Sequence, residues 1–347
     1  MLRLPPFDYR RPSSVGEAAA ILAGDGPAAR LVAGGTDLWP NLKRRHQQAS
    51  TVVSLMSIPE LQGIEPGEAS SDLRLGATAL LSEVAGNGDV RSRFPALARA
   101  VASISSPPLR NMGTIGGNLC LDTRCTYYNQ TEVWRRSIDY CMKEAGTVCW
   151  VAPSSPRCWA HCASDSAPML CALGARVRLV AENGDRMLPV DGLFRDDGIE
   201  YLDKRPDEIL TDIHLPLASD NNHCRSSFWK LRRRGSIDFA VLSVAVAIWF
   251  DEHDHVTKAA IYLGAVGSRP LAVEGASDLL TGETLTADRI DAVAALARKV
   301  ATPMDNTDFK TQWRGVMAER YTQAALREIT GEDPGVMAPK HGMGVGA

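Results

Sequence analysis

The sequence lacks a hydrophobic run long enough to cross a lipid bilayer. Its longest apolar stretch extends from Phe239 to Phe250, whereas a membrane-spanning helix needs roughly 20 residues. The N-terminus carries two adjacent prolines and several charges in place of the apolar stretch of a signal peptide. We therefore expect a cytoplasmic protein without a membrane span.

A strong excess of charge of either sign is also absent. The formal net charge is −3 at pH 7, which gives no global basic field to attract nucleic acid. The hydrophobic share of 45% and the charged share of 23% are typical of a globular protein. With 347 residues and no internal repeat, the chain is long enough for two or three packed units.

The chain has eight cysteines but no pair with the spacing CxxC. This absence argues against the usual bacterial ferredoxin motif and against most zinc knuckles. Six of the cysteines nevertheless fall between positions 120 and 162. In a reducing compartment, such cysteines are more often reduced or metal-bound than paired in disulfides. Thiolates on one flexible segment can converge on a soft metal centre such as a 4Fe–4S cluster, which takes four of them.

Two other interpretations of the cysteine-rich segment stay open at this point. Zinc could be held by some of Cys149, Cys158, His161 and Cys162. Alternatively, the cysteines are small buried side chains without a ligand. For Cys171 and Cys224, which are each isolated in a regular element, we prefer this second interpretation.

Hydrophobic periodicity predicts regular elements on both sides of residues 105–162, where the periodicity disappears. A structureless stretch of that length inside a compact domain is normally functional. Ser14 and Glu17 form a capping-box signature before the first helix, around 18–22, and Asp165 is the expected N-cap of the helix at 166–173. Other helices are predicted at 38–45, 95–104, 272–280, 287–300 and 312–329. Strands are predicted at 30–33, 51–54, 73–77, 176–181, 209–215, 240–250 and 256–266, the last two as an antiparallel hairpin.

Two glycine-rich stretches lie outside these elements, Ala33-Gly34-Gly35-Thr36-Asp37 and Gly113-Thr114-Ile115-Gly116-Gly117-Asn118. Each allows backbone N–H groups to approach a phosphate or a flavin closely. The first lacks the lysine of a P-loop, and the second is not the GxGxxG of a Rossmann turn. Taken alone, each stretch is more often a tight turn than a cofactor site, but their joint presence favours a cofactor.

These stretches resemble motifs of the flavoprotein subunits of molybdenum hydroxylases, a family that includes xanthine dehydrogenase and carbon monoxide dehydrogenase. The resemblance rests on residues 31–38, on residues 110–118 and on Ser164-Asp165 before a helix. It implies an α+β fold, with a two-part FAD-binding domain of the vanillyl-alcohol-oxidase/PCMH type and a C-terminal α+β domain with an antiparallel sheet and helices. The expected divisions are 1–56, 57–220 with a cysteine-rich insertion at about 119–164, 223–330, and a flexible tail at 331–347.

The resemblance also implies which residues contact FAD. The first motif would wrap the pyrophosphate with backbone amides, the second would line the flavin and its phosphates, and Asp165 would hydrogen-bond the cofactor. Leu210 and Lys230 fall at positions that contact flavin in such relatives. The complete expected set is Leu31, Val32, Ala33, Gly34, Gly35, Thr36, Asp37, Leu38, Thr114, Gly116, Gly117, Asn118, Asp165, Leu210 and Lys230.

Between Asn118 and Asp165, most members of this family have only a short loop. The longer segment in this chain is similar to the insertion in the beta subunit of 4-hydroxybenzoyl-CoA reductase. That similarity implies a 4Fe–4S cluster, with Cys120 and Cys162 as alternatives to a chosen ligand. The four expected ligands are Cys125, Cys141, Cys149 and Cys158.

The function implied by the resemblance is electron transfer, without a catalytic residue for the organic substrate in this chain. Ferredoxin would supply electrons to the cluster, FAD would collect them, and a small 2Fe–2S subunit would pass them to the molybdenum cofactor of a large subunit. There a phenolic aroyl-CoA would be dehydroxylated reductively. The assembly would be a dimer of heterotrimers. Trp134, Arg135 and Arg136 would either form a docking surface for ferredoxin or pack the inserted segment.

Two alternatives to this function stay open. In the first, the subunit exchanges electrons with NAD, as in xanthine dehydrogenase. In the second, the chain is a non-catalytic assembly module that is stabilised by zinc and has no flavin. A yellow purified protein that contains iron, sulfide and FAD would exclude the second alternative.

Overall fold

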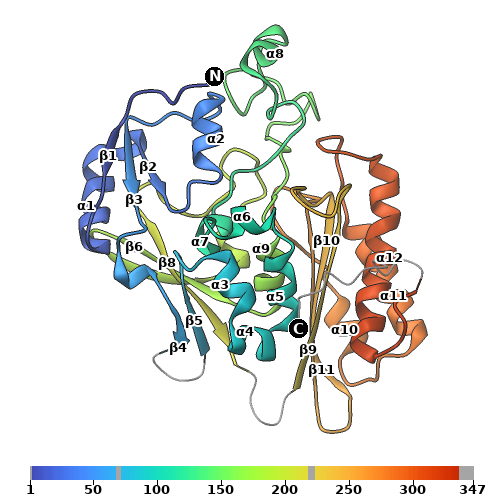
Figure 1. The fold of residues 1–347 in the computed structure, drawn as a ribbon. Helices are drawn as coiled ribbons and strands as arrows, with labels where there is room; N and C mark the ends of the chain where they lie inside the picture. The colour runs from blue at the N-terminus through green and yellow to red at the C-terminus, as the bar shows by residue number, and fades with distance from the viewer. Residues whose placement is uncertain (1, 68–71, 218–222, 336–347) are drawn as a thin grey trace.

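Three β-sheets follow one another along the chain, with helices packed between and around them (Figure 1). The computed structural model describes residues 2–67, 72–217 and 223–335. Within these ranges the predicted α+β fold is confirmed, including an antiparallel sheet covered by helices in the C-terminal part. None of the helices in them is long and apolar enough to cross a membrane.

The first sheet is small and parallel, in the order β1-β3-β2. It consists of β1 (Asp8–Arg10), β2 (Ala29–Val32) and β3 (Thr51–Ser54), and helix α1 (Val15–Asp25) packs against it. Strand β2 leads into the first glycine-rich stretch, and helix α2 (Leu38–Lys43) begins directly after it. The predicted order of strand, glycine turn and helix is therefore confirmed.

Only half of the predicted capping box forms at the start of α1. The Ser14 hydroxyl accepts a hydrogen bond from the backbone N–H of Glu17 at 3.2 Å, as expected for an N-cap. The Glu17 carboxylate, however, accepts from the backbone N–H of Ser13 at 2.7 Å and not from Ser14. The prediction was therefore right about where the helix begins and wrong about the reciprocal bond.

The second sheet is antiparallel and draws strands from both sides of the cysteine-rich segment. Its order β4-β5-β8-β6-β7 places β5 beside β8, so the chain returns to the same sheet after the excursion through that segment. The strands are β4 (Ile64–Pro66), β5 (Asp72–Gly76), β6 (Arg176–Ala181), β7 (Gly184–Pro189) and β8 (Ile209–Pro216).

Short helices fill the space between the second and third sheets (Figure 1). Their apolar side chains form the largest core of the molecule, which includes Leu97, Leu170, Ile213 and Ala245. These helices are α3 (Leu81–Gly86), α4 (Gly88–Arg93), α5 (Pro95–Ala102), α6 (Pro107–Arg110), α7 (Ile115–Leu119) and α9 (Ser166–Ala172). Single 3-10 turns lie at Gly26–Ala28, Pro59–Leu61 and Asp191–Leu193.

The third sheet is antiparallel, in the order β12-β11-β10-β9, and one of its faces is covered by C-terminal helices. Its elements are β9 (His223–Leu231), β10 (Leu242–Phe250), β11 (Val256–Gly264), β12 (Leu271–Ala272), α10 (Ala276–Leu280), α11 (Ala287–Val300) and α12 (Thr311–Thr330). The predicted hairpin is confirmed as β10 and β11. The helix predicted at 272–280 is shorter, because residues 271 and 272 pair with β11 as strand β12.

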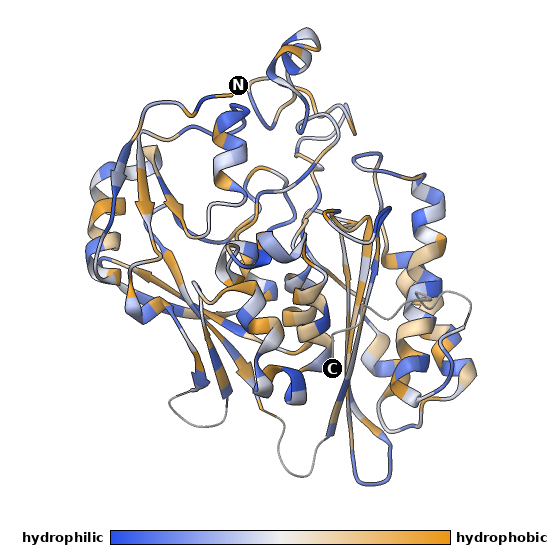
Figure 2. Cartoon of the chain, viewed as in Figure 1, coloured by the Kyte–Doolittle hydropathy of each residue, from blue (hydrophilic) through white to orange (hydrophobic). Residues whose placement is uncertain are grey.

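Strand β10 is apolar along its whole length because both of its faces are buried. Ala245 and Ala247 face the core between the sheets, whereas Val244, Val246 and Ile248 face the C-terminal helices. Figure 2 shows hydrophobic residues along the strands of the second and third sheets. The long apolar run in the sequence is therefore the signature of a doubly covered central strand.

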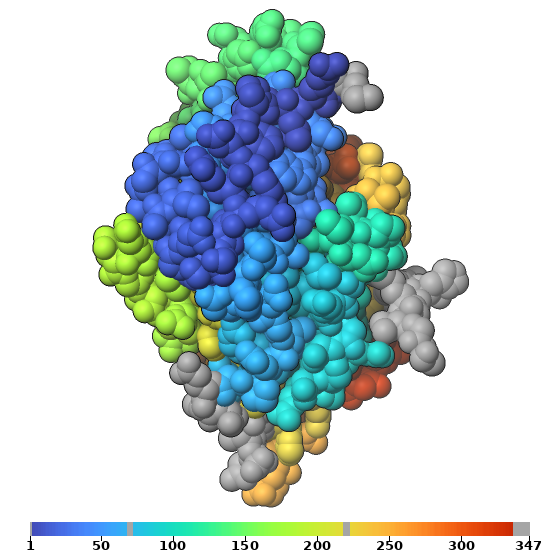
Figure 3. Space-filling view, turned by 60° about the vertical axis from the view of Figure 1, so that its left-hand side comes forward, coloured from blue at the N-terminus to red at the C-terminus, as the bar shows by residue number. Residues whose placement is uncertain are grey.

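The cysteine-rich segment is less irregular than predicted. Within residues 105–162, α6 and α7 lie before the first cysteine, and α8 (Glu132–Ser137) forms inside the cysteine-rich segment, with the Thr131 hydroxyl accepting from the N–H of Trp134. Helix α8 projects at one end of the molecule (Figure 1), and the segment forms a protrusion above the N-terminal residues (Figure 3). The loss of periodicity located the irregular segment, but it gave no indication of the short helices within residues 105–162.

Two predicted boundaries fall partly outside the described residues. The expected division between 220 and 223 lies next to the start of β9 at His223, and residues 218–222 lie outside the described ranges. The predicted tail at 331–347 overlaps the described ranges only as far as Gly335. The domain limits 1–56, 57–220 and 223–330 stay a prediction, although each of the three sheets falls within one of them.

Candidate functional site

A cavity of about 620 Å³ opens where the first and second sheets meet the cysteine-rich segment and the start of the third sheet. This volume lies in the range of roughly 300 to 1,000 Å³ that is usual for small-molecule and cofactor sites. All of the residues expected to bind FAD line this cavity except Lys230. They are Leu31, Val32, Ala33, Gly34, Gly35, Thr36, Asp37, Leu38, Thr114, Gly116, Gly117, Asn118, Asp165 and Leu210.

The first glycine turn packs directly on the backbone that precedes the second glycine motif. A Cβ atom on Gly34 would overlap with the main-chain oxygen of Met112. Gly35 has a φ of 71°, in the left-handed region that favours glycine, and a Cβ there would overlap with the Trp39 indole. Both glycines are thus required by the packing of the turn itself, besides any contact with a cofactor.

The second glycine motif forms the short helix α7 and is fixed to the chain that follows β5. Thr114 is the N-cap, and its hydroxyl accepts a hydrogen bond from the N–H of Gly117 at 3.2 Å. The N–H of Gly116 donates to the carbonyl of Ala77 at 2.9 Å, and a Cβ on Gly116 would lie 2.7 Å from that of Ala77. The absence of a side chain at position 116 therefore allows α7 to lie against the second sheet and to line the cavity.

Asn118 connects the two ends of the cysteine-rich segment. Its side-chain oxygen accepts from the hydroxyl of Ser164 at 2.9 Å and from the hydroxyl of Ser166 at 2.6 Å. The segment between them can therefore protrude without separating α7 from α9. This contact explains how a long insertion is compatible with an intact cavity.

Asp165 is a buried carboxylate on the cavity wall, and only one of its oxygens is paired. Oδ2 accepts a hydrogen bond from Lys230 Nζ at 2.6 Å, and the two side chains are 4% and 3% exposed. Oδ1 has no partner among the residues that the structure describes. Burial raises the pKa of Asp165, while Lys230 acts in the opposite direction. The unpaired oxygen is an acceptor available to a donor group of a bound cofactor.

Asp165 is the N-cap residue of α9, as predicted, but its side chain forms no capping hydrogen bond. The hydroxyl of Ser164 accepts from the N–H of Ala167 at 3.1 Å instead. Lys230 is buried within the molecule and does not itself line the cavity. Its place is behind Asp165, where its positive charge offsets the buried carboxylate.

Several cavity-lining residues were not foreseen from the sequence. Ser105 and Ile237 both have positive φ angles, 48° and 65°, and the N–H of Ile237 donates to the carbonyl of Ser105 at 3.0 Å. Such backbone conformations are uncommon for residues other than glycine and occur often at ligand sites. No sequence signal indicated them, because neither residue type favours a positive φ.

The cysteine-rich segment contributes to the same cavity. Arg124 pairs with Asp37 of the first glycine turn, and its guanidinium lies 4.9 Å from the ring centre of Phe239. Burial raises the pKa of Asp37, and Arg124 opposes this shift. One arginine thereby connects the first glycine turn, the cysteine-rich segment and the beginning of the third sheet.

A second, much smaller cavity is lined by the four cysteines expected to bind a cluster, which we call the thiol cavity. Cys120 lines the large cavity instead, and Cys162 is part of the main core between the sheets. Cys171 and Cys224 lie in α9 and β9, in agreement with their interpretation as isolated packing residues. The thiol cavity is lined by Cys125, Tyr127, Tyr128, Cys141, Met142, Lys143, Cys149, Trp150, Val151, Cys158 and Ala160.

Backbone amides face the sulfur atoms in the thiol cavity. Burial raises the pKa of Cys125 to about 11, and the amides of the residues two and three positions later lower it. Amides at the same two relative positions face Cys141. The N–H of Ala160 lies 3.4 Å from the sulfur of Cys158. These donors stabilise thiolates, the form of cysteine that binds metals.

Cys149 and Cys158 share a hydrogen bond. That bond and amides from residues 151, 152 and 159 lower the pKa of Cys149, although burial acts in the opposite direction. Within the described ranges, no three His, Cys, Asp or Glu side chains are grouped to hold a single metal ion. Both ring nitrogens of the buried His161 lack a hydrogen-bond partner there, and His161 does not line the thiol cavity.

Arg135 is buried inside the segment, which agrees with the second of its two interpretations, packing of the inserted segment. Its side chain is 1% exposed and forms ion pairs of 2.6 Å with Glu132 and with Glu144. It also donates to the carbonyl of Arg44 at 3.1 Å, which attaches α8 to the end of α2. The role of Arg135 is therefore to hold the segment in place, whereas Arg136 is 71% exposed.

The fold and the large cavity together define a flavoprotein of the α+β class, and comparison with known proteins gives the family. Residues 5–218 match the FAD binding domain in molybdopterin dehydrogenase, and residues 226–329 match the CO dehydrogenase flavoprotein C-terminal domain. The chain therefore belongs to the family of FAD-binding subunits of molybdopterin dehydrogenases.

Relatives extend over nearly the whole chain. The carbon monoxide dehydrogenase medium chain of Hydrogenophaga pseudoflava is 28% identical over 325 residues, covering 92% of this chain and 97% of the relative. The nicotinate dehydrogenase FAD-subunit of Eubacterium barkeri is 26% identical and covers 82% of this chain and 83% of its own length. A solved structure of the Hydrogenophaga carbon monoxide dehydrogenase covers 95% of this chain and 99% of the solved chain, with a TM-score of 0.77 and 26% identity.

Proposed function

We propose that this chain is the electron-transfer flavoprotein subunit of a molybdenum-dependent hydroxybenzoyl-CoA reductase. In this proposal, a 4Fe–4S cluster and FAD in this chain carry electrons from ferredoxin to a small 2Fe–2S subunit and a large molybdenum subunit. The expected setting is a cytoplasmic dimer of heterotrimers. FAD can take up electrons singly or in pairs, which suits it to connect one-electron carriers to a two-electron reduction.

The observation that carries the proposal is the convergence of four cysteines on one cavity. They come from four separate turns of one segment, and backbone amides face their sulfur atoms. Hydrogen bonds to the ligand sulfurs are among the factors that set the potential of an iron–sulfur cluster. A family that needs only FAD in this subunit has no use for such an arrangement, so it supports an additional one-electron centre.

The thiol cavity offers four cysteines and no other His, Cys, Asp or Glu side chain, which is the kind and number of ligands that a 4Fe–4S cluster takes. The described residues provide no compact group of three ligands for a metal ion. The cavity holds about 10 Å³, about the volume of one water-sized sphere. The loops that hold the cysteines would therefore have to move apart to admit a cluster.

For FAD, the fit rests on the glycine turns and on Asp165. Gly34 and Gly35 both line the cavity, where a glycine turn allows backbone N–H groups to approach a pyrophosphate. The unpaired Oδ1 of Asp165 provides a hydrogen-bond acceptor on the wall. We propose that these residues hold the cofactor at its two ends.

The test is to purify the complex under anaerobic conditions and to determine its cofactors and its electron donor. We expect four irons, sulfide and one FAD per copy of this chain, since a 4Fe–4S cluster takes four cysteine ligands. Reduced ferredoxin should then support reduction of 4-hydroxybenzoyl-CoA. Rapid flavin reduction by NADH without ferredoxin would favour the xanthine-dehydrogenase-like alternative, and zinc in place of iron would overturn the assignment of a cluster.

A further inference from the structure

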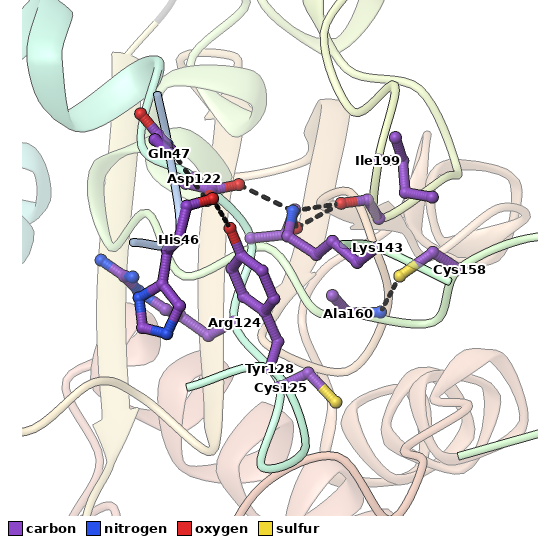
Figure 4. A network of polar contacts seen from close by, with 12 residues as sticks. His46, Gln47, Asp122, Arg124, Cys125, Tyr128, Lys143, Cys158, Ala160 and Ile199 are labelled. Carbon is purple, nitrogen blue, oxygen red and sulfur yellow. Dashed lines mark hydrogen bonds and ion pairs between the residues drawn. The ribbon is translucent and has the colours of Figure 1, made fainter. Parts of the chain in front are cut away.

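Two side chains line both the large cavity and the thiol cavity. They are Tyr128 and Lys143, and both belong to the cysteine-rich segment. Figure 4 shows them side by side, and the ammonium of Lys143 lies 5.0 Å from the ring centre of Tyr128. Together they make up a wall shared by the two cavities.

Each of the two residues also faces a cysteine with its backbone. The backbone N–H of Lys143 faces the sulfur of Cys141, and that of Tyr128 faces the sulfur of Cys125. The Tyr128 hydroxyl donates to the carbonyl of His46 at 2.7 Å, which fixes the ring in place. Only one residue thus separates the two cavities at each of these points.

Lys143 is held rigidly by partners that do not belong to the thiol cavity. Its Nζ donates to Asp122 at 2.7 Å, to the Thr123 hydroxyl at 2.7 Å and to the carbonyl of Gly198 at 2.6 Å. The Lys143 and Asp122 side chains are 5% and 4% exposed. Nζ also lies 5.3 Å from the ring centre of Tyr201, which lines the large cavity.

A fixed buried charge at this position acts on both cavities at once. Water screens it poorly, so its effect extends further than that of a charge at the surface. A positive charge stabilises whatever gains an electron beside it, and the neighbouring carboxylate of Asp122 opposes this effect.

We propose that Tyr128 and Lys143 form the boundary across which electrons pass between the cluster and FAD. At this boundary, the Lys143–Asp122 ion pair sets the reduction potentials of both centres. In each transfer, one centre loses an electron and the other gains it, and reduced ferredoxin supplies the electron. This inference rests on the proposed function, since it requires a cluster in the thiol cavity.

The experiment is a redox titration of the purified holo-complex with a matched set of variants. Cluster reduction is followed by electron paramagnetic resonance and flavin reduction by visible absorbance. Lys143→Met should shift both midpoint potentials to lower values, and Asp122→Asn should shift both to higher values. The double variant K143M/D122N should return both potentials towards those of the unmodified complex. Lys43→Met, at an exposed lysine of α2, is the control and should shift neither.

The outcomes separate this inference from the proposed function. A wild-type complex without iron would overturn the cluster itself, before any variant is measured. Wild type and variants could all keep full iron and flavin. If the variants then leave both midpoint potentials unchanged, or shift only one of the two, the proposal that the Lys143–Asp122 pair acts on both centres is wrong. If Lys143→Met fails to assemble, Asp122→Asn decides alone, because it keeps both the shape of the pair and the lysine.

Discussion

The large cavity and the thiol cavity lie side by side but are built in different ways. The large cavity takes its wall from the first two sheets, from the connection between β9 and β10, and from residues that are far apart in sequence, such as Gly34, Asn118, Asp165 and Ile237. The thiol cavity is built by residues 125–160 alone, with a small core of its own. A site shared among packed elements is maintained by the whole fold, whereas a site within one segment depends on what that segment binds.

Loss of one cysteine should give the largest effect and separate the two cavities most sharply. Cys141→Ser removes a thiolate from the thiol cavity, so we expect most of the iron to be lost while FAD is retained. Iron, sulfide and flavin are measured on the purified complex. Cys224→Ser, in strand β9, is the control and should keep both cofactors. Unchanged iron in Cys141→Ser would mean that the ligand assignment is wrong.

The large cavity should be most sensitive at Asp165. Asp165→Asn leaves Lys230 as a buried cation without its anion, which typically costs about 3 to 5 kcal/mol of folding free energy. It also alters the acceptor on the cavity wall, so flavin should be retained less well. Chemical unfolding and flavin content measure the two effects.

An exposed ion pair provides the control for this measurement. Asp185→Asn breaks the contact with Arg178, in which both side chains are 44% exposed, and should cost about 0 to 1 kcal/mol. Equal losses in the two variants would contradict the role that we assign to burial.

The first glycine turn should tolerate no side chain at Gly34. In Gly34→Ala, the new Cβ overlaps with the carbonyl of Met112, so the two cavity motifs must move apart, at a cost of about 3 kcal/mol. We expect a lower unfolding midpoint and weaker flavin binding, with iron content unchanged. Gly315→Ala is the matched control in helix α12, where a Cβ would meet nothing within 4 Å. It should be neutral or slightly stabilising.

Acid should lower the free energy of unfolding through His46, by less than the substitutions above. Burial lowers the pKa of His46 from 6.5 to about 4, and Arg135 contributes to this shift. His46 therefore binds a proton near pH 6.5 in the unfolded chain but only near pH 4 in the folded chain. The free energy of unfolding is unaffected by His46 above pH 6.5 and decreases as the pH falls towards 4. The loss should reach on the order of 2 kcal/mol.

Unfolding curves between pH 7 and pH 5 measure this effect. A His46→Gln variant lacks the titrating group and should show a weaker dependence on pH over that interval. An identical pH dependence in wild type and variant would show that another group is responsible.

The sequence predicted more of the large cavity than of its surroundings. The two glycine motifs line it, because glycine turns leave strong local signals. Asp165 and Leu210 also line it, but only the family resemblance indicated them. Lys230 was assigned to the cofactor itself, and its place behind Asp165 could not be foreseen, since β9 approaches α9 only in the folded chain. Ser105 and Ile237 left no signal, because their positive φ angles are imposed by the surrounding structure.

The sequence by itself determined the class of fold, the two glycine motifs and the clustering of cysteines in one segment. These features are local: periodicity, turn chemistry and spacing are written in neighbouring residues. Only the tertiary structure decided that four of the cysteines face one cavity, that Cys120 and Cys162 lie elsewhere, and that Tyr128 and Lys143 stand between the two cavities. Such proximities depend on how distant segments pack, and the order of residues along the chain does not encode them directly.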